Sequence, residues 1–153
     1  MRGITFEIPN AYGRYLFEIL HGIDIHKFTW KVGDGEAYYV ENNTLKDSLF
    51  LHTYQLNGMQ LFREISKEDY YLIFADLKGF PIGGILKEIN TYQDFEESDC
   101  QFVLLVVDSS YVTIYSKNKN TIKQLFSNAE NAGYKNISYI TDENDQNSTL
   151  VAF

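Results

Sequence analysis

The sequence predicts an α+β fold in which several helices pack on a mostly antiparallel sheet. The first observation is the apolar run FVLLVV at residues 102–107, which is too short for a helix and rich in Val, as in a strand buried on both faces. The second is the alternation of apolar and polar residues over 111–116, which follows three turn residues and predicts a hairpin with the first run. The third is that segments of helical period separate further short strands along the chain.

In the N-terminal half, four strands are predicted. Residues 4–8 alternate between apolar and polar side chains. Residues 28–32 and 37–40 flank a Gly-Asp-Gly turn, so we expect them to form a hairpin. Residues 48–53 are assigned to a further strand on weaker alternation.

Two helices are also expected in this half. Asn10 is a suitable N-cap for a helix over residues 11–21, and Gly22 suits the left-handed position after its end. The apolar spacing over 59–65 predicts a short second helix.

Residues 66–81 contain conflicting signals. The apolar residues of 70–77 have the i, i+3, i+4, i+7 spacing of a helix face, and an acidic capping sequence, SKED, precedes them. Tyr, Ile and Phe, which make up much of this segment, favour strands. Because the period and the cap agree, we predict a helix here, ended by Gly79 and Pro81.

The C-terminal half adds two helices to the hairpin. Thr91 caps a short acidic helix that runs to Ser98, and Asn118 or Asn120 caps a longer helix that ends at Gly133. The remaining predicted strands are residues 85–89, 137–141 and 148–153.

The order strand, helix, strand, strand occurs in both halves of this prediction. Two β-α-β-β halves of common origin would explain the order, and so would chance, because the match lacks the fixed period of a true repeat. No low-complexity linker divides the halves. We therefore predict a single globular domain over residues 1–153.

Composition and charge restrict the partners and the location. The chain has 13 Lys and Arg against 21 Asp and Glu, a formal net charge of −8, and no run rich in Lys or Arg. Phosphate groups and anionic membranes are bound by clustered positive charge, so we expect neither a nucleic acid nor a membrane as a partner. A single Cys and the lack of a long apolar run agree with a reducing cytoplasm.

No motif identifies a catalytic residue, and we expect no metal and no cofactor. Cys100 stands among acidic residues that would raise its thiol pKa, so a buried structural role is favoured over a nucleophilic one. His21, Asp24 and His26 are close in sequence, but the two His lack the i, i+4 spacing of ligands on one helix face. The acidic loop over 142–147 lacks the Gly and Glu positions of a calcium-binding loop.

The segment 88–99 is the densest acidic stretch of the chain. It contains five acids, no Lys or Arg, and two aromatic residues. A solvated surface is the simpler explanation for such a run. The alternative is a docking surface for a basic protein, where aromatic side chains supply buried area and the acids form a charged rim. Its binding residues would be Tyr92, Phe95, Glu96 and Glu97.

Three parts of the sequence carry a family resemblance. They are MRGITFEIPN with GRYLFEIL near the start, DFEESDCQFVLLVVDSSYVTIYSK in the middle and SYITDEND near the end. Together they resemble a domain-of-unknown-function family of small cytosolic proteins from Gram-positive bacilli. The resemblance covers nearly the whole chain, and it implies a single soluble bacterial domain without assigning a catalytic residue.

From these observations we favour a non-enzymatic protein-binding or interaction module. One alternative is a small hydrolase or transferase whose site is assembled from scattered residues, and another is a small-ligand-binding regulatory domain. A pocket with converging His, Asp or Glu side chains would favour an enzyme, whereas an aromatic and acidic surface patch would favour a protein partner.

Overall fold

The computed structural model shows nine strands and four α-helices, and it describes residues 1–51 and 53–153. His52, which falls in the strand expected over 48–53, lies outside the described residues. The strands are β1 Gly3–Glu7, β2 Phe28–Val32, β3 Glu36–Glu41, β4 Thr44–Ser48, β5 Gln55–Asn57, β6 Tyr70–Pro81, β7 Phe102–Val107, β8 Tyr111–Ser116 and β9 Lys135–Ile140. The helices are α1 Tyr15–Ile19, α2 Gly58–Ser66, α3 Tyr92–Glu97 and α4 Lys119–Asn131, with a 3-10 turn at Ile25–Lys27.

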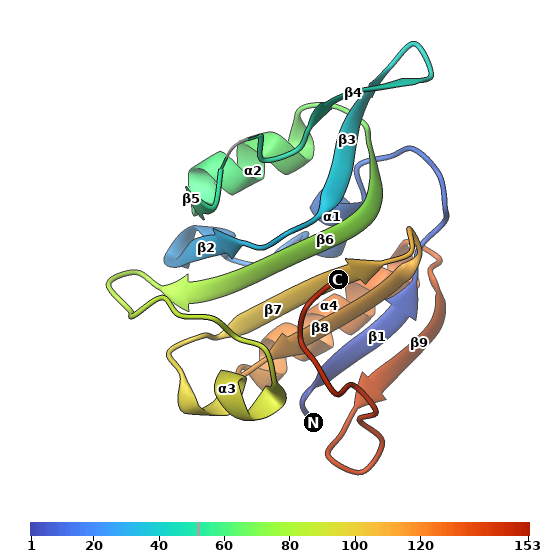
Figure 1. The fold of residues 1–153 in the computed structure, drawn as a ribbon. Coiled ribbons are helices and arrows are strands. Elements are labelled where there is room, and N and C mark those ends of the chain that lie inside the picture. The colour runs from blue at the N-terminus through green and yellow to red at the C-terminus, as the bar shows by residue number, and fades with distance from the viewer. Residues whose placement is uncertain (52) are drawn as a thin grey trace.

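All these strands join one antiparallel sheet in the order β4-β3-β6-β7-β8-β1-β9, with β2 and β5 as a branch on β6 (Figure 1). Helices α1, α2 and α4 cover one face of the sheet. The short helix α3 and the C-terminal segment lie over the other face (Figure 1). The predicted α+β class, with a mostly antiparallel sheet, is confirmed.

The β7–β8 hairpin forms as predicted and stands at the centre of the sheet. Leu104 belongs to the core beneath the three helices, whereas Leu105 belongs to the core beneath α3 and the C-terminal segment. Both side chains are buried, at 0% and 4% exposure. The strand therefore has no polar face, which is why its sequence is apolar throughout.

The prediction of a helix over 70–77 is wrong, because these residues belong to the twelve-residue strand β6. This strand pairs with β3 and then β2 along one edge and with β7 along the other. A register shift opposite Ile73 switches the alternation, so Tyr70 and Leu72, and then Ala75 and Leu77, face the same core. The helix-like spacing came from Tyr70, Ile73, Phe74 and Leu77, but Ile73 is half-buried and Phe74 packs against the other core, so these four residues do not share one face. Pairing along both edges overrides the local cap.

The hairpin predicted between residues 28–32 and 37–40 is also wrong. Both strands exist, but each pairs with the same edge of β6. The connection between them crosses that edge, and the Gly33 N–H donates to the Asp76 carbonyl oxygen at 2.9 Å. A Cβ atom on Gly35 would lie 2.7 Å from the Phe74 carbonyl oxygen, so the crossing requires glycine there.

The N-terminal helix is shorter than predicted and begins at Tyr15 rather than at residue 11. The segment before it is drawn to β6, where the Gly13 N–H donates to the Tyr70 carbonyl oxygen at 3.1 Å. Asn10 does not cap the helix, because its side chain accepts a hydrogen bond from the Tyr71 hydroxyl.

The segments predicted as strands over 85–89 and 148–153 are irregular in the structure. They meet on the second face of the sheet, where the Leu150 N–H donates to the Asn90 carbonyl oxygen at 2.8 Å. Ile89, Leu150 and Ala152 are buried there, whereas Ile85 and Phe153 are exposed, so the buried part of the apolar pattern reflects packing on a face rather than pairing at an edge. The second of the two expected β-α-β-β halves consequently lacks its last strand. The strand expected over 48–53 lies earlier, as β4.

Local signals located the other elements well. Asn57 caps α2 and Thr91 caps α3, each in a reciprocal capping box. Asn118, rather than Asn120, caps α4, and its side chain accepts two backbone N–H bonds. Gly22 and Gly133 both have positive φ values, of 76° and 75°, as expected for residues that follow a helix end.

We expect Leu104→Ala and Leu105→Ala each to reduce the free energy of unfolding by about 2–5 kcal/mol, since each opens a cavity in a different core. Urea denaturation measures both values, with Lys123→Ala on the exposed side of α4 as a control that changes stability by less than about 0.5 kcal/mol. A negligible loss for either Leu variant would show that one face of β7 is not packed.

Candidate functional site

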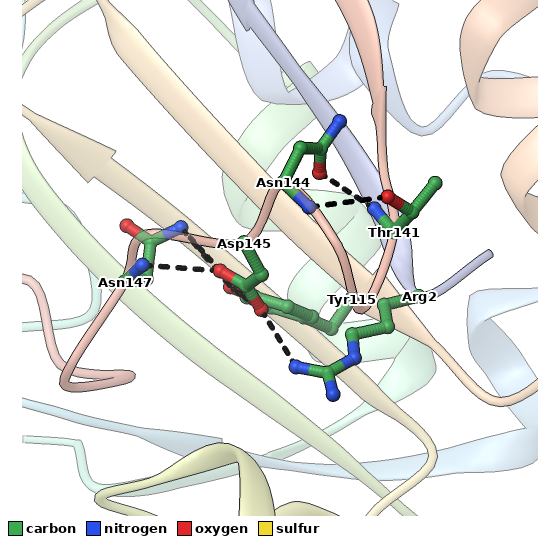
Figure 2. A network of polar contacts seen from close by, with 6 residues as sticks. All are labelled: Arg2, Tyr115, Thr141, Asn144, Asp145 and Asn147. Carbon is green, nitrogen blue, oxygen red and sulfur yellow. Dashed lines mark hydrogen bonds and ion pairs between the residues drawn. The ribbon is translucent and has the colours of Figure 1, made fainter.

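A polar cluster gathers residues from distant parts of the chain at one end of the sheet (Figure 2). Its centre is Asp145, in the loop that follows β9, whose side chain is only 3% exposed. The Tyr115 hydroxyl on β8 donates to both carboxylate oxygens of Asp145, at 3.0 and 3.1 Å. The Arg2 guanidinium lies 3.2 Å from the same carboxylate. Asn147 adds its backbone N–H at 3.1 Å and its side-chain amide at 3.2 Å.

The loop is folded so that Asp145 points toward Tyr115. The Thr141 N–H donates to the side-chain oxygen of Asn144 at 2.8 Å, and the Asn144 N–H donates back to the Thr141 hydroxyl at 3.3 Å (Figure 2). The Asp145 N–H then donates to the Thr141 carbonyl oxygen at 3.1 Å. These bonds form a local turn of the kind that Asn and Thr side chains favour.

The network determines the charge state of the cluster. Burial on its own would raise the pKa of Asp145, but the hydrogen bonds from Asn147, Tyr115 and Arg2 outweigh burial and hold the pKa below its usual value. Burial and the adjacent Asp145 carboxylate raise the pKa of Tyr115 well above its usual value. At neutral pH the cluster therefore contains an ionised carboxylate, a guanidinium and a neutral phenol.

Tyr92 of α3 joins the cluster through aromatic contacts. The Arg2 guanidinium lies 3.9 Å from the centroid of the Tyr92 ring, within the range of a cation–π interaction. The ring also packs against Tyr115, with centroids 5.6 Å apart. Burial, which has the largest effect, and the charge of Glu96 raise the pKa of Tyr92. The charge of Arg2 lowers this pKa, and the charges of Asp145 and Asp142 add to the increase. The charges of Glu96 on α3 and of Asp142 and Asp145 in the loop thus act on the same ring.

Comparisons with known proteins place the chain in a family. Residues 1–151 match the family model described as Protein of unknown function (DUF2691). The chain belongs to this family. It is also similar to the Uncharacterized protein YncE of Bacillus subtilis (strain 168), with 41% identity over 150 residues that cover 97% of each chain. No solved structure matches the chain. The predicted resemblance to a domain-of-unknown-function family of bacilli is confirmed.

Of the four binding residues predicted in this DUF2691 protein, the structure exposes Glu96 and Glu97 and partly buries Tyr92. Phe95 is 1% exposed, so it belongs to the core and offers no contact area to a partner. The Lys117 ammonium covers its ring at 5.0 Å. The role of these residues in binding stays a prediction, with Tyr92 as its aromatic component.

Sequence analysis missed Arg2, Tyr115 and Asp145. The loop over 142–147 was compared only with a calcium site, and nothing local relates it to a residue 143 positions earlier. The signal that could have pointed to this site is the high content of Asp and Asn in the loop. Their side chains stabilise turns, and such a turn can orient a neighbouring carboxylate.

The other candidates do not converge. His21, Asp24 and His26 are exposed, and the Asp24 carboxylate accepts the His26 backbone N–H at 3.3 Å. Across residues 1–51 and 53–153, no group of three or more His, Cys, Asp or Glu side chains is arranged to hold a metal ion. In the same part of the chain, no helix is both long and apolar enough to span a membrane.

We expect Asp145→Asn to destabilise the protein by about 1.5–3 kcal/mol at pH 7, the usual value of hydrogen bonds to a charged group. Because the folded pKa of Asp145 lies below its unfolded value of about 3.9, the carboxylate stabilises the fold above that pH and this stabilisation disappears as the pH falls through the folded pKa. Urea denaturation from pH 7 to pH 3 should therefore show the difference from the wild type shrinking in acid. The exposed neighbour Asp142→Asn is the control, and a difference that is constant with pH would contradict the assignment.

Cys100 is expected to be chemically inert. Its side chain is fully buried, and this burial, rather than the neighbouring acids, raises the thiol pKa to about 11. We therefore expect labelling by a thiol reagent at pH 7 to be slow in the folded protein and fast after unfolding, because only the thiolate reacts. Rapid stoichiometric labelling of the folded chain would contradict this expectation and would favour a catalytic role.

Proposed function

We propose that this DUF2691 protein is a non-enzymatic binding module that docks a basic protein on a surface we call the α3 patch. The patch consists of Tyr92, Glu96 and Glu97 of α3 with Asp142 and Glu143 of the loop after β9. The observation that carries the proposal is that Arg2 links the two segments, which are distant in sequence: its guanidinium lies 3.9 Å from the centroid of the partly exposed Tyr92 ring and 3.2 Å from the Asp145 carboxylate of the loop.

The charge of the patch suits a basic partner. Its four acids are exposed. Of the neighbouring cations, Arg2 is already engaged by Asp145, and the Lys117 ammonium donates to the Ser98 carbonyl oxygen. Exposed acids of one sign raise the rate of association with a positively charged protein, and they repel nucleic acids and anionic membranes. A cytoplasmic location is part of the proposal, because a chain with one Cys has no internal disulfide that needs an oxidising compartment.

The aromatic component suits the same partner. The Tyr92 ring already accepts a guanidinium on its face, that of Arg2, and Asp145 accepts the same group as an ion pair. A Lys or Arg side chain of a partner would meet the same kind of surface beside it. Phe95, Tyr115 and the packed core beneath hold the ring in place, so little side-chain entropy is lost on binding.

The test compares two double variants with the same change in net charge. Glu96→Lys with Glu97→Lys alters the patch, whereas Glu41→Lys with Glu130→Lys alters exposed positions on β3 and α4. After affinity capture of a partner from bacterial lysate, we expect the patch variant to slow association by about tenfold at low salt and by less than about twofold at 0.5 M salt, because salt screens steering.

The control variant should associate at nearly the wild-type rate at both salt concentrations. Equal slowing by both double variants would indicate a general charge effect and would remove the α3 patch from the interface.

A further inference from the structure

A buried ion pair on β6 lies apart from the α3 patch. Asp76 and Lys78 are 6% and 5% exposed, and the Lys78 ammonium lies 2.6 Å from the Asp76 carboxylate. The ammonium also donates to the Leu150 carbonyl oxygen at 2.6 Å, and the Asp76 carboxylate accepts the Ala152 N–H at 3.2 Å. A Lys ammonium has three donors, so these two bonds leave one that a further acceptor can use.

The ion pair lines a cavity of about 180 Å³. The charged and amide side chains around it are Lys31, Asp34, Asp76, Lys78, Glu88 and Asn90. A second cavity, of about 280 Å³, adjoins the first and shares Gly33, Asp34 and Asp76 with it. Aromatic residues, including Phe50 and Phe74, line this second cavity. We call the first cavity the polar chamber and the second the aromatic chamber. The carboxylates of Asp34 and Asp76 line both of them.

The lysines of the polar chamber form a cross-strand pair. Lys31 and Lys78 stand directly opposite each other in the register of β2 and β6. Like charges in this position destabilise a sheet unless anions lie between them. Here Asp76 pairs with Lys78, and Glu88 pairs with Lys31 at 2.7 Å.

Glu88 shows where an added carboxylate would lie. Its hydrogen bond to Lys31, followed by the charges of Lys31 and Lys78, lowers the pKa of Glu88, so its carboxylate is in the field of both lysines. The Glu88 side chain is 75% exposed, and exposed ion pairs contribute little to stability. A ligand carboxylate could replace it on Lys31 at small cost and also accept the third donor of Lys78.

Carboxylates line the same chamber as the two lysines. Asp34 is exposed in the Gly-Asp-Gly connection, and it lines both cavities together with Asp76. A ligand that carried only a negative charge would face these two carboxylates, and a ligand that carried only a positive charge would face the two lysines. A dipolar ligand is complementary to both.

We propose that this pair of cavities binds a small zwitterion, an α-amino acid with an apolar side chain. Lys31 and Lys78 bind its carboxylate, Asp34 and Asp76 bind its ammonium, and the aromatic chamber receives its side chain. None of the α3 patch residues lines either cavity, so this ligand site is separate from the proposed protein-docking surface.

The test is isothermal titration calorimetry of the full chain with leucine and phenylalanine. Matched probes lack one charge each: 4-methylpentanoate lacks the ammonium of leucine, and 3-methylbutylamine lacks its carboxylate. We expect at least one of the amino acids to bind with a dissociation constant below about 1 mM and the two single-charge probes to bind at least tenfold more weakly.

Variants assign the binding to this cavity. Lys31→Met and Asp34→Asn, both at partly or fully exposed positions, should each weaken amino-acid binding at least tenfold. Lys123→Met and Asp69→Asn, which line neither cavity, should not change it. Circular dichroism confirms that each variant folds.

Equal binding of 4-methylpentanoate and leucine would indicate a simple anion site instead of a zwitterion site and would overturn the proposal. The absence of binding of either amino acid at about 10 mM would also overturn it.

Discussion

The fold depends on the pairing of β6 along both of its edges. This strand joins β7 on one side, and on the other side it joins β3 over its first half and β2 over its second half. This second edge is divided between two strands, and the connection between them crosses the edge at Gly33 and Gly35. The two proposed chambers meet at that crossing, because both are lined by Gly33 and Asp34 of the crossing and by Asp76, whose carbonyl oxygen accepts the Gly33 N–H.

The same constraint explains which parts of the fold could be predicted. The β7–β8 hairpin, α2, α3 and α4 are encoded by their own residues: an apolar run, turn residues, and Asn or Thr caps. The β6 segment was misassigned because its residues have a helix-like apolar spacing and a local cap, whereas pairing with strands distant in sequence makes it a strand with residues buried on both faces. The β2–β3 hairpin was misassigned because each strand pairs with β6 over long sequence separations, which no local turn signal reports.

The candidate site could likewise be predicted only in part. Its acids on α3 and in the 142–147 loop were visible as two separate segments, and the capping residue of α3 was correctly identified. Their convergence was not visible, because Asp145 reaches Tyr115 and Arg2 over separations of 30 and 143 residues. The sequence could not show that Phe95 belongs to the core and Tyr92 to the surface, because both are aromatic residues in one short amphipathic helix. The inertness expected of Cys100 rests on burial, a tertiary property, and the sequence argument from neighbouring acids had assigned a different cause.

The buried Asp76–Lys78 pair is better explained by specificity than by stability. Burying two charges costs solvation energy that their attraction only partly offsets, so an apolar pair of similar size could stabilise the sheet as well. What an apolar pair could not do is bind the backbone of the C-terminal segment at Leu150 and Ala152. The Leu150 N–H in turn donates to the Asn90 carbonyl oxygen, and the Asn90 N–H donates to Asp94 in the first turn of α3. A continuous chain of hydrogen bonds therefore connects the proposed ligand cavity with the helix that carries the proposed docking patch, and any coupling between the two sites has a short physical route through it.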